Sequence, residues 1–110
     1  MGKGYRVELT TLAREQILQI AHYIKDDLQA PETAEKFVDY LQTEIAKLDT
    51  MPERVVLVDE EPWHSRGVHK YIMGHYIAYF IVIKPAGIVR VIAVVLDRRD
   101  QHMRLDSLEL

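Results

Sequence analysis

The sequence predicts a two-layer α+β domain, in which a pair of helices packs on one face of a mainly antiparallel, four-stranded sheet. Two apolar stripes at helical spacing occupy the first half of the chain, after one short alternating segment. Three runs rich in β-branched and aromatic residues follow, separated by short turns that contain Gly or Pro. The 110 residues suit one domain, residues 1–110, because a single core typically serves ~100–150 residues. The expected order is therefore strand, helix, helix, strand, strand, strand.

The first half of the chain is expected to form a strand and a helix hairpin. Residues 5–9 alternate between apolar and polar side chains, as in a half-buried strand. Thr10 and Thr11 offer hydroxyl N-caps for a helix over residues 11–29, whose apolar positions recur on one face. A second apolar stripe predicts a helix over residues 31–51, which begins with a proline and stops before the next one. The short connection between them makes the two helices antiparallel.

The second half is expected to form a three-stranded meander. After an irregular, acidic connection over residues 53–66, the β-type runs are joined by tight turns, which only antiparallel neighbours allow. A polar tail, residues 97–110, ends the chain. The predicted strands are residues 68–73, 76–83 and 88–96.

The helices can bury their apolar stripes only against the sheet, so the core is expected between these two layers, with the other sheet face left for solvent or a partner. Trp63, the one tryptophan, is expected at the core or its rim, covering the helix hairpin. An exposed sheet edge also favours self-association into a homodimer when no partner is bound. The expected core residues are Ile17, Ile20, Ile24, Phe37, Leu41, Ile45, Phe80 and either Val91 or Ile92.

Composition limits the chemistry that the chain can perform. Without cysteine there is no thiol nucleophile, disulfide or Cys-ligated metal, and the scattered histidines predict no metal site and no cofactor. No apolar run approaches the ~20 residues that cross a bilayer, and we expect a cytoplasmic location. The net charge of −3 combines an acidic and a basic part. Residues 1–61 carry 7 Lys and Arg against 13 Asp and Glu, whereas residues 62–110 carry 7 against 4.

Six stretches, in order along the chain, carry a likeness to a known family: Tyr5–Thr10, Ala30–Glu35, Met51–Arg54, Arg66–Ile72, Tyr76–Phe80 and Val94–Asp100. Together they resemble the RelE/ParE superfamily, bacterial toxins of type II toxin–antitoxin (plasmid-stabilisation) modules, over roughly residues 5–101. The resemblance implies the same fold, a cognate antitoxin as partner, and growth arrest through one of two targets. RelE-like members cut mRNA in the ribosomal A site, whereas ParE-like members poison DNA gyrase.

The resemblance and the charge distribution together place the working surface on the basic half of the chain. Metal-free RNA cleavage needs a base, an acid and cations beside the phosphate. In a nuclease the catalytic residues would be Arg66, Lys70, Arg98 and His102. In a protein-binding toxin the target-binding residues would be Arg66, His69, Lys70, Arg98, Arg99 and Arg104. Ordinary solvated charge is the alternative interpretation of these cations.

Two features slightly favour gyrase as the target. RelE-like nucleases typically place a tyrosine or a His–Tyr pair just after the last strand, where this chain has His102 and no tyrosine. The pI near 5.9 also contrasts with the strong basicity that suits binding inside the ribosome. The favoured function is therefore a ParE-like gyrase poison. The alternatives are a RelE-like, ribosome-dependent mRNA endoribonuclease and a non-toxic member that binds only its antitoxin.

Overall fold

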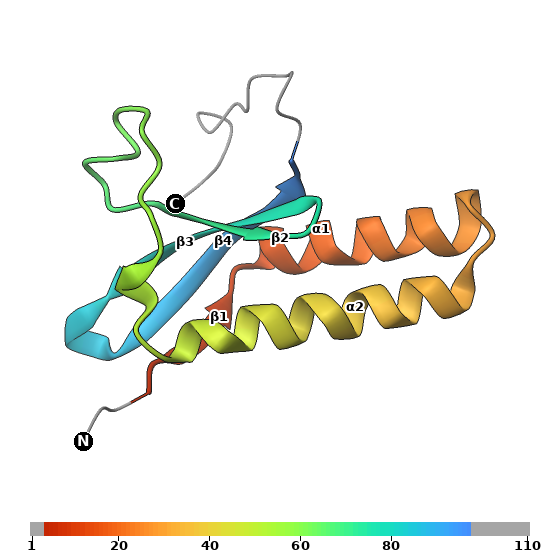
Figure 1. Ribbon diagram of the computed structural model, residues 1–110, viewed down its shortest axis with the longest axis horizontal. Helices are drawn as coiled ribbons and strands as arrows, with labels where there is room; N and C mark the ends of the chain where they lie inside the picture. Colours follow the sequence, from red (N-terminus) through yellow and green to blue (C-terminus); the bar gives the residue numbers. More distant parts are fainter. Residues whose placement is uncertain (1–3, 98–110) are drawn as a thin grey trace.

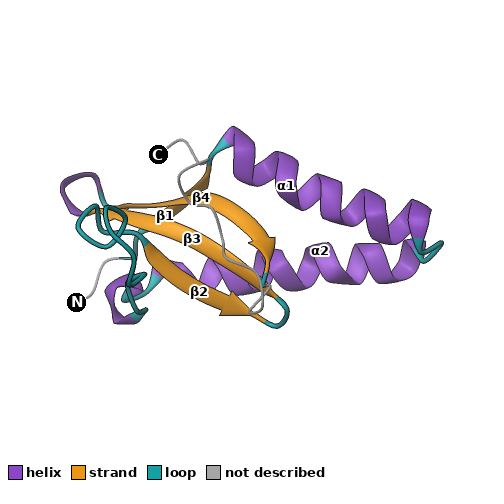
Figure 2. Ribbon diagram, turned by 90° about the horizontal axis from the view of Figure 1, so that it is seen from above, coloured by secondary structure: helices purple, strands orange, loops and turns teal. Residues whose placement is uncertain are grey.

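Helices and sheet form two layers, as Figure 1 shows for the computed structural model, which describes residues 4–97. The helices are α1 (Thr11–His22), continued by the π-helical turn η1 (Tyr23–Asp27), and α2 (Pro31–Ala46). The strands are β1 (Arg6–Leu9), β2 (His69–Met73), β3 (Tyr76–Ile83) and β4 (Ile88–Leu96). Three 3₁₀ turns complete the described part: η2 (Lys47–Asp49), η3 (Pro52–Arg54) and η4 (Lys84–Ala86). Both helices lie against one sheet face and project past its end (Figure 2). The predicted α+β fold is confirmed.

The sheet is mostly antiparallel, with the spatial order β1-β4-β3-β2. The β2–β3 and β3–β4 pairs are antiparallel, whereas β1 runs parallel to β4, with Arg6 level with Ile88. The register of β3 against β4 shifts between Tyr79 and Phe80, and Ile92 is the extra residue in β4. This bulge changes which β4 side chains face each side of the sheet.

Local sequence explains where the helices begin and end. The hydroxyl of Thr10 accepts a hydrogen bond from the amide of Ala13 at 3.1 Å, which makes Thr10 the N-cap of α1. α2 begins with Pro31, at a position where no amide donor is needed. α2 ends at Ala46, before the predicted residue 51, because a 3₁₀ turn follows it and Met51 has a left-handed backbone with φ 47°.

The main core lies between the helices and the sheet, as predicted. Ile20 and Phe37 are half-buried and pack against this core, while Ile92 is buried on the other side of the sheet. The predicted core residues that the structure buries are Ile17, Ile24, Leu41, Ile45, Phe80, Val91 and Ile92. Within residues 4–97, no helix combines the length and the apolarity needed to span a membrane.

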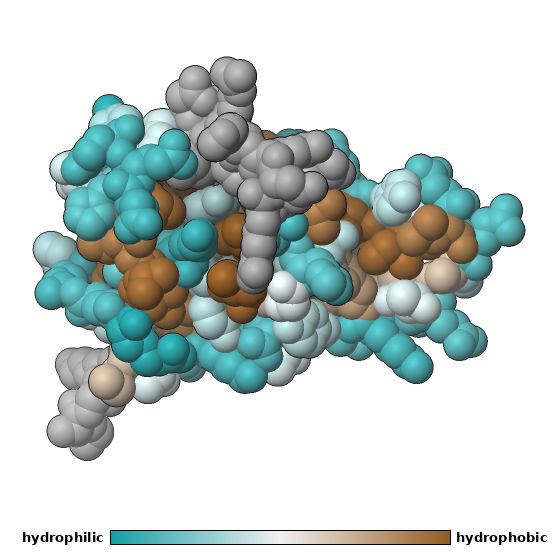
Figure 3. Space-filling model, turned by 45° about the horizontal axis from the view of Figure 1, so that its top comes forward, coloured by the Kyte–Doolittle hydropathy of each residue, from teal (hydrophilic) through white to brown (hydrophobic). Residues whose placement is uncertain are grey.

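A second, smaller core lies on the opposite face of the sheet, and it corrects two predictions. Trp63 was expected over the helix hairpin, but it packs on the face that the helices leave free. The connection between α2 and β2 therefore covers part of that face, which the sequence assigned to solvent or a partner. Figure 3 shows apolar side chains on this side of the molecule in two groups, one over the sheet and one along the projecting helices. The second core consists of Val58, Trp63, Val68, Ile77, Tyr79, Ile92 and Ala93.

Candidate target-binding surface

Arg66 lies on the sheet face opposite the helices, where the ring of Trp63 holds it. The guanidinium carbon of Arg66 is 5.3 Å from the centroid of the Trp63 ring, within the range of a cation–π interaction. Trp63 is itself fixed by burial against the strands, whereas Arg66 is exposed. The sequence identified Arg66 but not its contact with Trp63. Trp63 lies in a loop without a periodic pattern, so the sequence does not show on which face of the sheet its side chain packs. A tryptophan three residues before an arginine was the available signal.

A compact turn presents this Arg66–Trp63 pair. The amide and the hydroxyl of Ser65 donate to the carboxylate of Glu61 at 2.9 and 2.7 Å, and these bonds lower the pKa of Glu61. The amide of Val68 bonds to the carbonyl of Trp63 at 3.1 Å, which closes the turn onto the sheet. Gly67 has φ +77°, a conformation that glycine adopts without strain. The backbone on both sides of Arg66 is thus constrained.

Lys70 is half-buried on the same face, in β2 opposite Tyr79 of β3. Directly paired residues of antiparallel strands share a face, so the lysine stem lies beside the phenol. Burial raises the pKa of Tyr79, and the negative charges of Asp97 and Glu60 raise it further. Tyr79 is therefore a neutral hydroxyl donor at physiological pH and not a phenolate base.

His69 was expected to bind the target together with Lys70, but the structure places the two side chains on opposite faces of the sheet. Successive strand residues point to opposite faces, so His69 points to the helix side. It is 8% exposed, its ring stacks on Phe80 with centroids 4.8 Å apart, and its Nδ1 lies 2.7 Å from the carbonyl oxygen of Val55. His69 thus links the segment between α2 and β2 to the sheet.

Two further arginines on this face are engaged in ion pairs. Glu8 of β1 is 2.9 Å from Arg6 and 3.6 Å from Arg90. Within residues 4–97, by contrast, neither Arg66 nor Lys70 forms an ion pair. Among the described residues, Arg66 and Lys70 can therefore present their charges to a ligand without first breaking an ion pair, and both are among the residues identified from the sequence.

The remaining predicted site residues lie outside the described residues: Arg98, Arg99, His102 and Arg104. In residues 4–97 no group of three or more His, Asp or Glu side chains could hold a metal ion. The surface described here therefore consists of Arg66 on Trp63 and Lys70 beside Tyr79.

Comparison with known proteins identifies the family. The family described as "ParE toxin of type II toxin-antitoxin system, parDE" matches residues 7–101. The chain belongs to the ParE toxin family. The resemblance to the RelE/ParE superfamily is thus confirmed, and so is the general function, the toxin of a type II toxin–antitoxin module. None of the curated proteins matches the chain.

Two solved structures share the fold of this ParE-family toxin. The chromosomal ParDE toxin–antitoxin system from P. aeruginosa has a TM-score of 0.69 and 19% identity, over 86% of this chain and 97% of that chain. The RelBE2 toxin–antitoxin complex from Mycobacterium tuberculosis has a TM-score of 0.60 and 18% identity, over 87% of this chain and 94% of that chain. Both likenesses support the two-layer fold described above.

Proposed function

We propose that this ParE-family toxin arrests growth by binding DNA gyrase through the sheet face opposite the helices. The observation that supports this most is the pair of cations, Arg66 and Lys70, that has no ion-pair partner within residues 4–97. Such cations can bind carboxylates on a protein target, which orients the encounter and speeds association. Because Trp63 already orients Arg66, less side-chain freedom is lost on binding.

The described part of this face is less suited to cutting RNA. A nuclease needs a general base within hydrogen-bond reach of the 2′-hydroxyl. His69 points to the opposite side, and the raised pKa of Tyr79 keeps that phenol protonated. Protein binding requires none of these groups to change its protonation state.

We further propose a cognate antitoxin as partner and the cytoplasm, where gyrase acts, as the location. Both solved relatives are toxin–antitoxin assemblies, which supports the partner. Permanent complexes of this kind bury ~2,000 Å² or more. Co-expression of the neighbouring small reading frame should rescue growth and co-purify with the toxin. If no neighbouring reading frame binds, the assignment to a two-component module is wrong.

Gyrase-dependent supercoiling of a relaxed plasmid tests the target. Purified toxin should inhibit the reaction, and Arg66→Glu should weaken inhibition at least ~10-fold, because reversal leaves a carboxylate on the target facing a like charge. Lys70→Glu should have the same direction of effect. Lys36→Glu is the matched control, because it makes the same charge change at an exposed position of α2.

Mapping transcript 5′ ends after induction tests the two alternatives. Cuts set by codon position, with gyrase unaffected, would identify a RelE-like endoribonuclease. Absence of both cuts and gyrase inhibition, with the antitoxin still bound, would identify a family member that only binds its antitoxin. Either result would overturn the proposal.

A further inference from the structure

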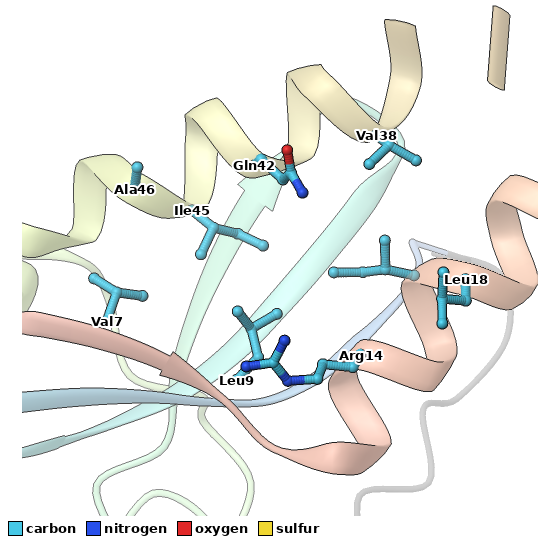
Figure 4. Close-up of a pocket in the computed structure, with 9 residues that line it drawn as sticks. Val7, Leu9, Arg14, Leu18, Val38, Gln42, Ile45 and Ala46 are labelled. Carbon is cyan, nitrogen blue, oxygen red and sulfur yellow. The ribbon is translucent and has the colours of Figure 1, made fainter. Parts of the chain in front are cut away.

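We propose that the outer groove between α1 and α2 is a self-association surface, in which the groove of one copy packs on the same groove of a second copy. The groove runs along the helix pair in two stretches, about 390 and 490 Å³ in volume, which share Leu18 and Val38. Figure 4 shows the inner stretch, where Val7 and Leu9 of β1 form the floor between the two helices. This surface is separate from the cations that are proposed to bind gyrase.

The groove has an apolar interior in both stretches, and polar and charged side chains line its rims. Leu18 projects from the middle of α1 and is 58% exposed, although it occupies a helix that already buries another face against the sheet. Val38 of α2 is half-buried beside it, and Ala21 and Ala34 continue the apolar lining toward the helix tips. A continuous apolar surface of this kind marks an interaction site more often than an isolated exposed leucine does.

The rims of the groove carry opposite charges. The α1 rim is basic, with Arg14 and Lys25, whereas the α2 rim is acidic, with Glu35 and Asp39. Within residues 4–97 none of these four exposed side chains forms an ion pair. These charges can therefore form ion pairs with a second copy, because the basic rim of one groove can face the acidic rim of another.

Symmetry selects one arrangement of the two copies. A two-fold axis along the groove places α1 of one copy on α2 of the other. Because α1 and α2 form a hairpin, Lys25 and Glu35 lie at the same end, so each Lys25 meets the other copy's Glu35. An axis across the groove would instead place α1 on α1 and bring like charges together. The complementary arrangement makes the same ion pair twice.

The size of the groove predicts a weak dimer. The 12 residues of α1 and the 5 of η1 extend ~25 Å, and two adjacent helices are ~20 Å wide. Two such faces bury ~1,000 Å² in total, which is below the ~1,200 Å² at which stable, specific interfaces begin. We therefore expect a reversible equilibrium between monomer and dimer with a Kd in the micromolar range.

Sedimentation velocity of the full-length toxin, separated from antitoxin and refolded, tests the inference between ~1 and ~200 µM, a range that brackets micromolar dissociation. Wild type should shift from monomer to dimer. Leu18→Glu should raise the dimer Kd at least ~10-fold while circular dichroism stays unchanged, because the position is exposed. Lys25→Glu should raise the dimer Kd ~10-fold, because the new carboxylate then faces Glu35 of the other copy at two places in the dimer. Lys36→Glu, outside the groove, is the control and should leave the Kd unchanged.

The charge swap decides whether the partner is a second copy. Lys25→Glu/Glu35→Lys restores both pairs with reversed polarity and should return the Kd to within ~3-fold of wild type. A wild-type chain that stays monomeric, a dimer insensitive to Leu18→Glu, or a swap that fails to rescue would each overturn the inference. If Leu18→Glu weakens only antitoxin binding, the groove belongs to the antitoxin, which overturns it as well.

Discussion

Replacing Trp63 by alanine should remove ~3–5 kcal/mol from the free energy of unfolding. Trp63 is 9% exposed and lies in the second core, against strand residues of β3 and β4. A buried tryptophan removes ~150–250 Å² from water, which at ~25 cal/mol per Å² corresponds to ~4–6 kcal/mol. A domain of 110 residues has a total stability of ~5–15 kcal/mol, so this variant should be marginally folded.

Urea unfolding followed by far-ultraviolet circular dichroism measures this loss. Trp63→Phe is the matched control, because it keeps a ring in the pocket, and it should lose less than half as much. The same control should retain most of the supercoiling inhibition, because a phenyl face still supports Arg66. A loss below ~1 kcal/mol for Trp63→Ala would refute the packing of this side chain on the sheet.

The remaining predictions concern stability. Leu41→Asp should unfold the chain, because Leu41 is 0% exposed and an unpaired buried charge costs several kcal/mol; a melting curve like that of wild type would contradict the helix-face assignment. Thr10→Ala should cost ~1 kcal/mol in urea unfolding through loss of the N-cap, and Thr10→Ser should not. Hydrogen bonds from Lys47 and then from Tyr71 lower the pKa of Glu44 in the folded chain below the ordinary value of 4.5. The ionised Glu44 therefore stabilises the fold above pH 4.5, and this stabilisation is lost as the pH falls through the pKa of Glu44 in the folded chain. Glu44→Gln should therefore reduce the loss of stability in acid, as thermal melts at several pH values can measure.

Periodicity predicted the regular elements well because each one buries a continuous face. Residues 76–83 and 88–96 form strands over the predicted bounds, since dense β-branched runs end at turns. The first helical segment reaches Asp27, two residues short of its predicted end. β1 pairs in parallel with β4, although the two strands lie far apart in the sequence. Local sequence patterns do not show which strand β1 pairs with, or in which direction.

The site was predicted less well because its geometry depends on an aperiodic loop. Nothing local shows that the segment around Trp63 folds back over the strands opposite the helices. His69 is a different case, because strand alternation alone already places it on the opposite face of the sheet from Lys70. The imidazole of His69 stacks on Phe80 and its Nδ1 bonds to the carbonyl of Val55, so both its ring and this polar atom have partners inside the fold.

The parallel pairing of β1 with β4 has a consequence for synthesis of the toxin. Residues Arg6–Leu9 pair with Ile88–Val91, so β1 has no partner strand until β4 has been made. A contact of such long sequence separation forms late and slowly, because most of the chain must be ordered to close it. A polypeptide released before residue 88 lacks β4, the strand that joins β1 to β3. Interrupted translation should therefore yield fragments that cannot complete this four-stranded sheet.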